Sequence, residues 1–243
     1  MAEIPMHRLT EFAGPSAADL DFFKGLCGPE RALPRRSIIR AQGDPVEQIY
    51  LLSEGWVTSS VDLRNGERQI VKIHIPGDVL GAPSLALESA ADTLIAVTDV
   101  KIRAMPLNAL GRIFKETPAL AASLFLSAQQ ERVFLMERLA SVGRMPAMNR
   151  LVVLLLHVHD RLVVLGHTKG LIEWPLTQTD IGDALGLTTV HVNRMMRALK
   201  GEGLVDRRGS ILRLYDIEAL RRLAGLSDRH WISRPDWLAK IAL

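Results

Sequence analysis

The sequence predicts an α+β fold with an antiparallel β-roll first, one long helix next, and a small helical module with a two-stranded ribbon last. Three observations carry this prediction. Short β-branched segments recur between residues 37 and 105, nothing interrupts a helix from residue 118 to 142, and two helix-like runs after residue 177 meet at a glycine before a hairpin.

The first domain is expected to cover residues 1–117. Turn signals at Gly43-Asp44, Asn65-Gly66 and Pro76-Gly77-Asp78 separate its strand-like segments. Asn-Gly suits a type I′ turn, so we expect a tight hairpin at Asn65-Gly66. Strands at this spacing, without long helices between them, are typical of an antiparallel barrel or roll; the segments are SIIRA, QIYLLSEG, WVTSSVDL, RQIVKIHI and TLIAVTDVKIRAM.

A long helix and a hinge are expected over residues 118–145, because Pro118 can begin a helix and Gly143 and Pro146 end it. Apolar residues recur in it at spacings of three, four or seven, which predicts a dimerisation seam interrupted at Glu131. The alternative is a core helix that packs on its own roll. The seam residues are Leu124, Ala128, Leu135, Leu139 and Val142.

A winged helix-turn-helix is expected within residues 146–243. If Gln178 is its first position, Gly182 is the small residue where the helices meet and Gly186 lies in the turn. The strands LVDR and ILRLY around Arg208-Gly209-Ser210 then form a wing. The apolar positions of the motif are all suitably filled, by Ile181, Leu185, Leu187, Val192 and Met195.

The outer face of the second helix carries side chains that suit major-groove chemistry: Thr189, Val190, Asn193 and Arg194. His191 could contact a base or phosphate, or pack beside the first helix. An alternative is a small α+β module whose basic residues are only solvated. The residues expected to contact the DNA backbone are Thr177, Thr188, Arg197, Lys200, Arg207 and Arg208.

The charge distribution agrees with a polyanionic partner for the second half of the chain. Residues 1–143 contain 15 Lys and Arg against 17 Asp and Glu, whereas residues 144–243 contain 15 against 10. The longest apolar run, residues 151–156, is too short to span a membrane, and the start lacks a signal peptide. Cys27 is the one cysteine, which excludes an internal disulfide. We expect a cytoplasmic protein.

These motifs together resemble the Crp/Fnr superfamily of bacterial transcription regulators over residues 20–225. The roll carries Gly43-Asp44, Ser53-Glu54-Gly55 and the segment PGDVLG, and residues 177–214 match the winged helix. The resemblance implies a homodimer that binds a palindromic operator in double-stranded DNA and contacts RNA polymerase. It also implies that Arg194 reads guanine, while Val190 replaces a common glutamate and Thr189 an arginine.

The resemblance further implies an effector pocket of the cyclic-nucleotide type, and here its key residues are absent. Ala82 occupies the position of the ribose-binding glutamate, and no arginine occurs between Asp78 and Val100 to pair with a phosphate. We therefore expect that cyclic AMP is not the effector. An unknown small molecule, or no effector, remains open. The vestigial pocket comprises Gly81, Ala82, Leu85 and Ala90.

No cofactor and no catalytic activity are predicted. His74 could in principle bind haem, but a histidine in an alternating strand is more often an outward or satisfied core residue; Cys27 could be a redox sensor. His157 and His159 are two residues apart on a helix and cannot share a metal. The alternative function is a ligand- or haem-binding sensor or interaction module that has lost DNA binding. Trp231 and Trp237, beyond the family's usual end, are expected to be packing anchors.

Overall fold

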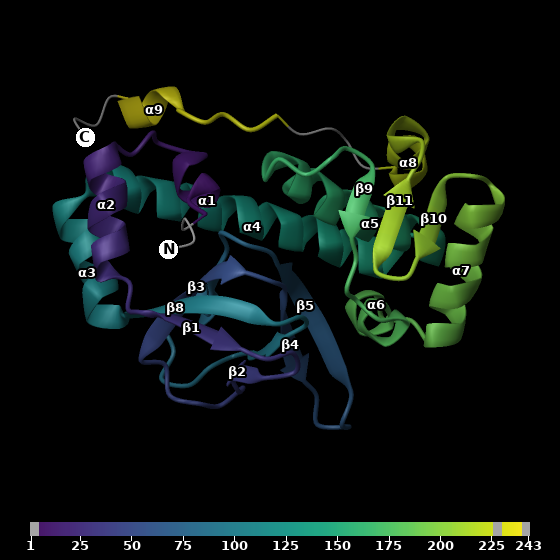
Figure 1. Cartoon of the computed structure of the whole chain (residues 1–243), viewed down its shortest axis with the longest axis horizontal. Helices are drawn as coiled ribbons and strands as arrows, with labels where there is room; N and C mark the ends of the chain where they lie inside the picture. Colours follow the sequence, from purple (N-terminus) through teal and green to yellow (C-terminus); the bar gives the residue numbers. More distant parts are fainter. Residues whose placement is uncertain (1–4, 226–229, 240–243) are drawn as a thin grey trace. The chain divides into compact units, whose positions relative to one another are not determined.

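Two four-stranded sheets form the predicted roll in the computed structural model, which describes residues 5–225 and 230–239 (Figure 1). One sheet has the strand order β1-β8-β3-β6 and the other β2-β7-β4-β5. The pairs β1/β8, β3/β8, β3/β6, β2/β7 and β4/β7 are antiparallel. The strands are β1 (Glu30–Leu33), β2 (Ile38–Arg40), β3 (Gln48–Glu54), β4 (Val57–Asp62), β5 (Arg68–His74), β6 (Val79–Leu80), β7 (Thr93–Ala96) and β8 (Val100–Pro106).

The described chain falls into two units. Unit 1 contains residues 5–66, 72–133 and 230–239, and unit 2 contains residues 67–71 and 134–225. The long helix α4 (Pro118–Arg144) is shared between them. The other helices are α1 (His7–Thr10), α2 (Ala17–Leu26), the short 3-10 helix η1 (Ala82–Ser84), α3 (Leu107–Glu116), α5 (Ala147–Val164), α6 (Gln178–Leu185), α7 (Thr189–Gly201), α8 (Ile217–Ala224) and α9 (Asp236–Ala239).

The structure corrects two details of the predicted strands. The segment TLIAVTDVKIRAM forms β7 and β8, which belong to different sheets. The turn between β4 and β5 is not type I′, because that turn needs a positive φ at both central residues and Asn65 has none. Instead, the Gly66 N–H donates to the Leu63 carbonyl at 2.9 Å, and Gly66 alone of the pair has a positive φ, 83°.

Strand β3 is buried on both faces, and its alternating side chains enter two different cores. Tyr50 and Leu52 pack in the interior of the roll. Ile49 and Leu51 point the other way and pack with residues of α1, α2, α3 and α4. The strand therefore joins the roll to the helices of unit 1 through its own side chains.

Helix α4 is tied to unit 1 by ionic contacts as well as by apolar packing. Arg8 of α1 forms a hydrogen-bonded ion pair with Glu131 and also donates to Gln130. Lys72 of β5 lies 2.9 Å from the other Glu131 carboxylate oxygen. Glu131 thus contacts α1 and β5 of its own unit, and it is not an interruption in a helix–helix seam.

The exposed apolar stripe of α4 differs from the predicted seam at its first residue only. Leu124 is half-buried and packs on the core of unit 1, whereas Phe125 is exposed. From Phe125 the spacing of three and four continues through the exposed Arg132. We call this set the α4 stripe; its apolar members are Phe125, Ala128, Leu135, Leu139 and Val142.

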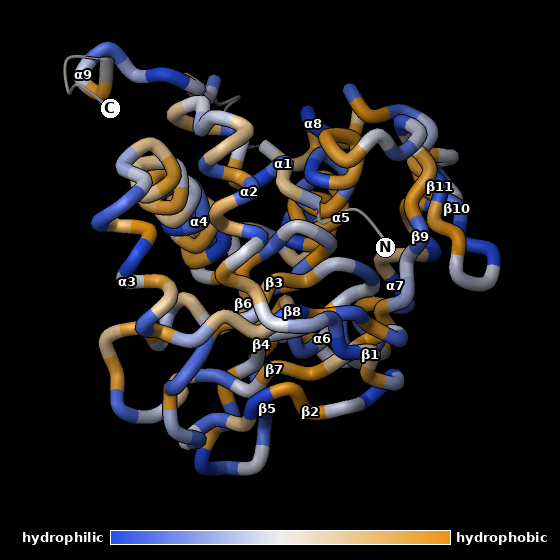
Figure 2. Tube along the Cα trace, turned by 60° about the vertical axis from the view of Figure 1, so that its left-hand side comes forward, coloured by the Kyte–Doolittle hydropathy of each residue, from blue (hydrophilic) through white to orange (hydrophobic). Residues whose placement is uncertain are grey.

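Unit 2 is built on the apolar helix α5, much of which is coloured as hydrophobic in Figure 2. Helix α5 contacts α6, α7, α8 and strand β9. A three-stranded antiparallel sheet of order β10-β11-β9 completes the unit. Its strands are β9 (Leu171–Glu173), β10 (Val205–Arg208) and β11 (Ile211–Leu214). Among the described helices, none has the length and apolar character needed to cross a membrane.

One ion pair lies inside the roll. The Arg40 Nη2 atom of β2 is 2.6 Å from the Asp92 Oδ1 atom and 3.3 Å from the Ser84 Oγ atom. Both charged side chains are almost fully buried, with 4% and 7% of their surface exposed. Gly81 has a φ of 82° and lies against the guanidinium, since a Cβ atom there would be 2.7 Å from Nη1.

Removal of one partner of this pair should destabilise unit 1. We expect Arg40→Met to lower the free energy of unfolding by about 3–5 kcal/mol, because Asp92 is left buried without a counter-charge. The double variant Arg40→Met/Asp92→Leu should recover most of the loss. Urea unfolding of the three proteins measures this, and an unrestored double variant would show that packing, rather than charge, accounts for the effect.

Candidate DNA-binding surface

Helix α6 begins with the reciprocal cap that its sequence predicts. The Thr177 Oγ1 atom accepts the Asp180 N–H at 3.1 Å, and the Asp180 carboxylate accepts the Thr177 N–H at 2.9 Å. Thr177 is exposed beside this cap, and Gln178 follows as the first helical residue. The start of the helix-turn-helix is therefore fixed by local hydrogen bonds.

The two glycines of the motif lie where the sequence predicts them. Gly182 is buried, and a Cβ atom at this position would lie 2.5 Å from the Leu187 carbonyl oxygen. Gly186 caps α6 in the left-handed conformation, with φ at 64°. Both requirements are backbone requirements, so the crossing of α6 and α7 depends on these residues having no side chain.

Two arginines of unit 2 satisfy the carbonyls at the end of α6. The Arg138 Nη2 atom donates to the Ala184 carbonyl at 2.5 Å, and the Arg150 Nη1 atom donates to the Leu185 carbonyl at 3.0 Å. Burial lowers the pKa of Arg138 to about 10. These contacts hold the C-terminal end of α6, while the Thr177 cap holds its N-terminal end.

Helix α7 presents the predicted reading face to solvent. Thr189, Val190 and Arg194 are exposed, with Val190 at 74%, and Asn193 is half-buried. His191 is exposed, and the Thr188 Oγ1 atom accepts its N–H at 3.3 Å as the cap of α7. The opposite face packs into unit 2 through Val192, Met195 and Leu199.

The wing residues differ in what they contact. Arg207 is half-buried and donates to the carbonyls of Gly209 and Leu176 at 3.2 and 3.1 Å, so it braces the wing against the segment before α6. Burial lowers its pKa. In contrast to the expectation for this residue, most of its donors are already engaged within the protein. Arg208 is exposed at the tip of the wing.

Asp206 holds two of the expected phosphate-binding residues. Its carboxylate oxygens lie 2.8 Å from Lys200 Nζ and 3.0 Å from Arg208 Nε. The two cations lower the pKa of Asp206 through hydrogen bonds and charge. The side chain of Arg194 differs, because no ion pair or hydrogen bond within the described ranges 5–225 and 230–239 involves it. Its guanidinium is ready for an external acceptor.

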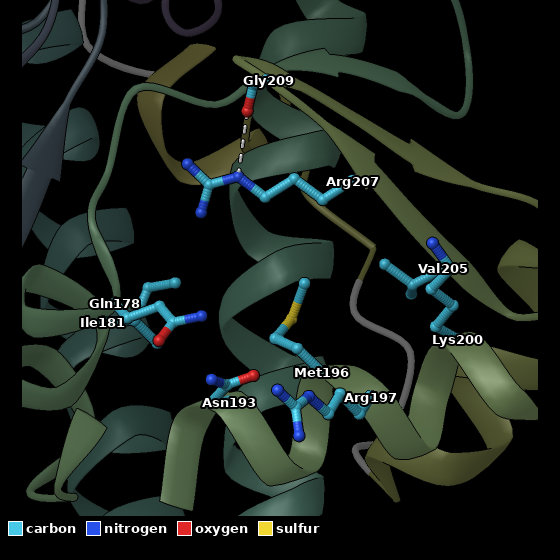
Figure 3. A pocket seen from close by; sticks show the side chains of 9 residues that line it. All are labelled: Gln178, Ile181, Asn193, Met196, Arg197, Lys200, Val205, Arg207 and Gly209. Atoms are coloured by element: carbon cyan, nitrogen blue, oxygen red, sulfur yellow. Dashed lines mark hydrogen bonds between the residues drawn. The ribbon is translucent and has the colours of Figure 1, made fainter. Parts of the chain in front are cut away.

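A hollow of about 400 Å³ lies between α6, α7 and the wing (Figure 3). Three cationic side chains line it, of which Lys200 pairs with Asp206 and Arg207 donates to backbone carbonyls. Gln178 and Met196 belong to this hollow, although neither was predicted as a site residue from the sequence. The lining residues are Gln178, Ile181, Asn193, Met196, Arg197, Lys200, Val205, Arg207 and Gly209.

The histidines considered for metal or haem binding have structural roles. His159 is buried, with Nδ1 2.8 Å from Asp160 Oδ1 and Nε2 accepting the Gly170 N–H at 3.0 Å. His74 is buried with Nε2 2.7 Å from Ser59 Oγ, and burial lowers its pKa. The Nδ1 atom of His74 lies 3.5 Å from the Asp78 Oδ2 atom. In the described ranges, no group of three or more His, Cys, Asp or Glu residues could hold a metal ion.

Cys27 is a half-buried thiol that donates to the Phe23 carbonyl. Burial raises the pKa of its thiol to about 11, with a smaller opposing effect from Arg103. A reactive cysteine needs a lowered pKa, since the thiolate is the reactive form.

Comparison with known proteins agrees with this geometry. Residues 30–117 match the cyclic nucleotide-binding domain, and residues 149–223 match the Crp-like helix-turn-helix domain. The chain belongs to the Crp/Fnr superfamily of transcription regulators. It is a DNA-binding transcription regulator, a class whose members are not enzymes.

Relatives of this Crp/Fnr protein cover most of its length. The transcriptional regulatory protein btr of Bordetella pertussis is 26% identical over 75% of each chain. The transcriptional activatory protein AadR of Rhodopseudomonas palustris is 28% identical over 77% of each chain. The structure of FixK2 from Bradyrhizobium japonicum has a TM-score of 0.74 and 26% identity, and covers 82% of this chain and 98% of its own.

The roll of this Crp/Fnr member differs from the sequence expectation at the vestigial pocket. The four residues of this pocket lie in the connection between β6 and β7, and among them Leu85 is 39% exposed. A cation is present after all, because Arg40 of β2 lies against Gly81. The segment between Asp78 and Val100 contains no arginine, but β2, which is distant in the chain, supplies one.

The close approach at Gly182 can be tested with a matched pair of glycines. Gly182→Ala should lower the free energy of unfolding by about 1–3 kcal/mol, because its methyl group would meet the Leu187 carbonyl. Gly201→Ala, in α7 with open space around it, should change stability by no more than about 1 kcal/mol. Urea unfolding measures both. Equal stability of the two variants would contradict the steric argument.

Proposed function

We propose that the protein acts as a homodimer that reads a two-fold palindromic operator through α7. The single observation that carries this proposal is the outer face of α7, where Thr189, Val190 and Arg194 are exposed beside the half-buried Asn193. Arginine offers two donors to guanine, asparagine can pair with adenine, and the methyl groups of threonine and valine fit thymine.

The backbone contacts proposed here come from around the reading face. Five exposed residues lie at the starts of α6 and α7, along α7 or on the wing: Thr177, Thr188, Arg197, Lys200 and Arg208. The cationic hollow of Figure 3 lies beside them and suits a phosphate near the start of α6. Arg207 contributes indirectly, because it holds the wing in place.

The α4 stripe supports the proposed dimer. Leu139 is 76% exposed and Leu135 is 49% exposed, whereas Leu120 near the start of the helix is buried in the core of unit 1. Apolar residues at a heptad spacing are typical of a helix that pairs with a second copy. A two-fold dimer would place its recognition helices in successive major grooves, about 34 Å apart. Contact with RNA polymerase is proposed from family membership.

Cyclic AMP is not the proposed effector. Its phosphate would have to displace Asp92 from Arg40, which would leave a buried carboxylate beside a buried phosphate. Two possibilities then follow for the roll: it binds a different small molecule, or it binds no effector.

Selection from a random duplex library with the purified protein tests the proposed reading. We expect enrichment of a two-fold palindrome, and we expect Arg194→Ala to remove the preference at one base pair of each half-site, at a cost of about 1–3 kcal/mol. Arg208→Ala is the matched control, because a wing that no longer reaches its phosphate weakens binding without changing the sequence preference. No enrichment would favour the alternative, an interaction module without DNA binding.

Asp206 gives an independent prediction. Asp206→Asn should strengthen duplex binding by about two- to fivefold at low salt, because Lys200 and Arg208 no longer share a carboxylate. Glu202→Gln removes the same charge from the end of α7 and serves as the control. Fluorescence anisotropy over a salt series measures both. If both variants bind the duplex equally well, the gain in affinity comes from net charge alone and not from the release of Lys200 and Arg208.

A further inference from the structure

A carboxylate of α6 lies beside one of the proposed phosphate contacts. The Asp180 Oδ2 atom is 2.7 Å from the Thr177 Oγ1 atom and accepts the Thr177 N–H at 2.9 Å. Asp183 is the second acidic residue of α6, whereas α7 contains none. A DNA phosphate that approaches Thr177 therefore approaches two like charges, and their repulsion opposes its binding.

Arg68, the first residue of β5, pairs with both of these carboxylates. Its Nη2 atom is 2.9 Å from the Asp180 Oδ1 atom, and its Nε atom is 2.7 Å from the Asp183 Oδ2 atom. All three residues belong to unit 2, since this unit includes residues 67–71. The three side chains are between 19% and 31% exposed, so water screens the two ion pairs only in part.

The backbone of β5 near Arg68 is itself bonded to α6. The side-chain amide of Gln69 donates to the Asp183 and Ala184 carbonyls at 2.6 and 3.0 Å. Arg138 of α4 donates to carbonyls of both β5 and α6. Because these bonds already hold the strand segment beside α6, the ion pairs of Arg68 have to order little more than its own side chain.

Arg68 is distant in sequence from the helix-turn-helix whose charge it balances. It precedes Asp180 by 112 residues. The Crp-like helix-turn-helix match covers residues 149–223, whereas Arg68 lies within the match to the cyclic nucleotide-binding domain at residues 30–117. The acidic helix and the cation that compensates it thus come from two different matched domains.

We propose that Arg68 is an electrostatic component of the DNA-binding surface, where it neutralises α6 and so allows Thr177 to bind a DNA phosphate. This inference rests on the proposed function, because it concerns the phosphate expected at the start of α6. With Arg68 in place, the group formed with Asp180 and Asp183 has a net charge of −1 instead of −2. The contribution of Arg68 is one of charge, so salt should weaken it.

The first test is duplex binding by Arg68→Met over a salt series, measured by fluorescence anisotropy with a labelled duplex that carries the selected palindrome. Affinity should fall about five- to tenfold at about 50 mM salt, but only about twofold or less at about 300 mM, because salt screens the exposed carboxylates. Arg68→Lys keeps the charge and should bind within about twofold of the wild-type protein at both salt concentrations.

Two further variants separate the charge of Arg68 from its hydrogen bonds. Asp183→Asn removes one carboxylate from α6 and should strengthen binding about two- to threefold at low salt. The double variant Arg68→Met/Asp183→Asn has the wild-type net charge without the ion pair, and should return to within about threefold of wild-type affinity.

Arg64→Met is the matched control, because Arg64 is exposed in the turn before β5 and its loss removes the same charge from the same connection. Its affinity for the duplex should stay within about twofold of the wild-type value at both salt concentrations.

The outcomes distinguish this inference from the proposed function. An equal loss of affinity in Arg68→Met at both salt concentrations, or no loss, would overturn the charge role. A double variant as weak as Arg68→Met, or an equal loss in Arg64→Met, would do the same. Asp183→Asn keeps the test decisive if Arg68→Met does not fold, since binding no tighter than wild type at low salt would contradict the inference. Failure of the wild-type protein to bind any palindrome would overturn the proposed dimeric reading itself, and this inference with it.

Discussion

The approach of Gly182 to the Leu187 carbonyl is the constraint on which the reading face depends. It brings the backbone of α6 against the turn before α7, and the caps at Thr177 and Thr188 then fix where each helix begins. Arg138 and Arg150 donate to the last carbonyls of α6, and Arg207 bonds the wing to the segment before α6. These hydrogen bonds stabilise the same helix-turn-helix. Side chains that lie on the surface of α7 thus have rigid backbone support, which recognition of bases requires.

The sequence was sufficient for features that depend on local pattern. The helix-turn-helix offsets, the capping residues, α4 and most strands of the roll follow from spacing and turn chemistry. Long-range contacts were not accessible. Leu124 looks like a seam residue by spacing, but unit 1 packs against it; Glu131 looks like an interruption, but Arg8 and Lys72 are its partners. The partners of Arg40 and Arg207 also lie in distant segments, so residue spacing does not predict these contacts.

The charged residues of the protein fall into two groups with different consequences. Arg40 with Asp92, and Arg8 with Glu131, are largely buried pairs that each need their partner. Lys200, Arg208 and Arg194 lie at the surface, where an incoming phosphate or base can replace water or a carboxylate at modest cost. A count of basic residues along the sequence cannot separate these groups, because burial decides which cations are available to a partner.

The membership of residues 230–239 in unit 1 has a consequence for the order in which the protein is made. Residues 230–239 of unit 1 follow the last described residues of unit 2 in the chain. A ribosome releases the DNA-binding unit before it releases Trp231, so Phe12 lacks its contact with this ring until residue 231 has emerged. Any premature stop within unit 2 therefore also deprives unit 1 of its last segment, and a truncated chain would expose an aromatic surface that the complete chain covers.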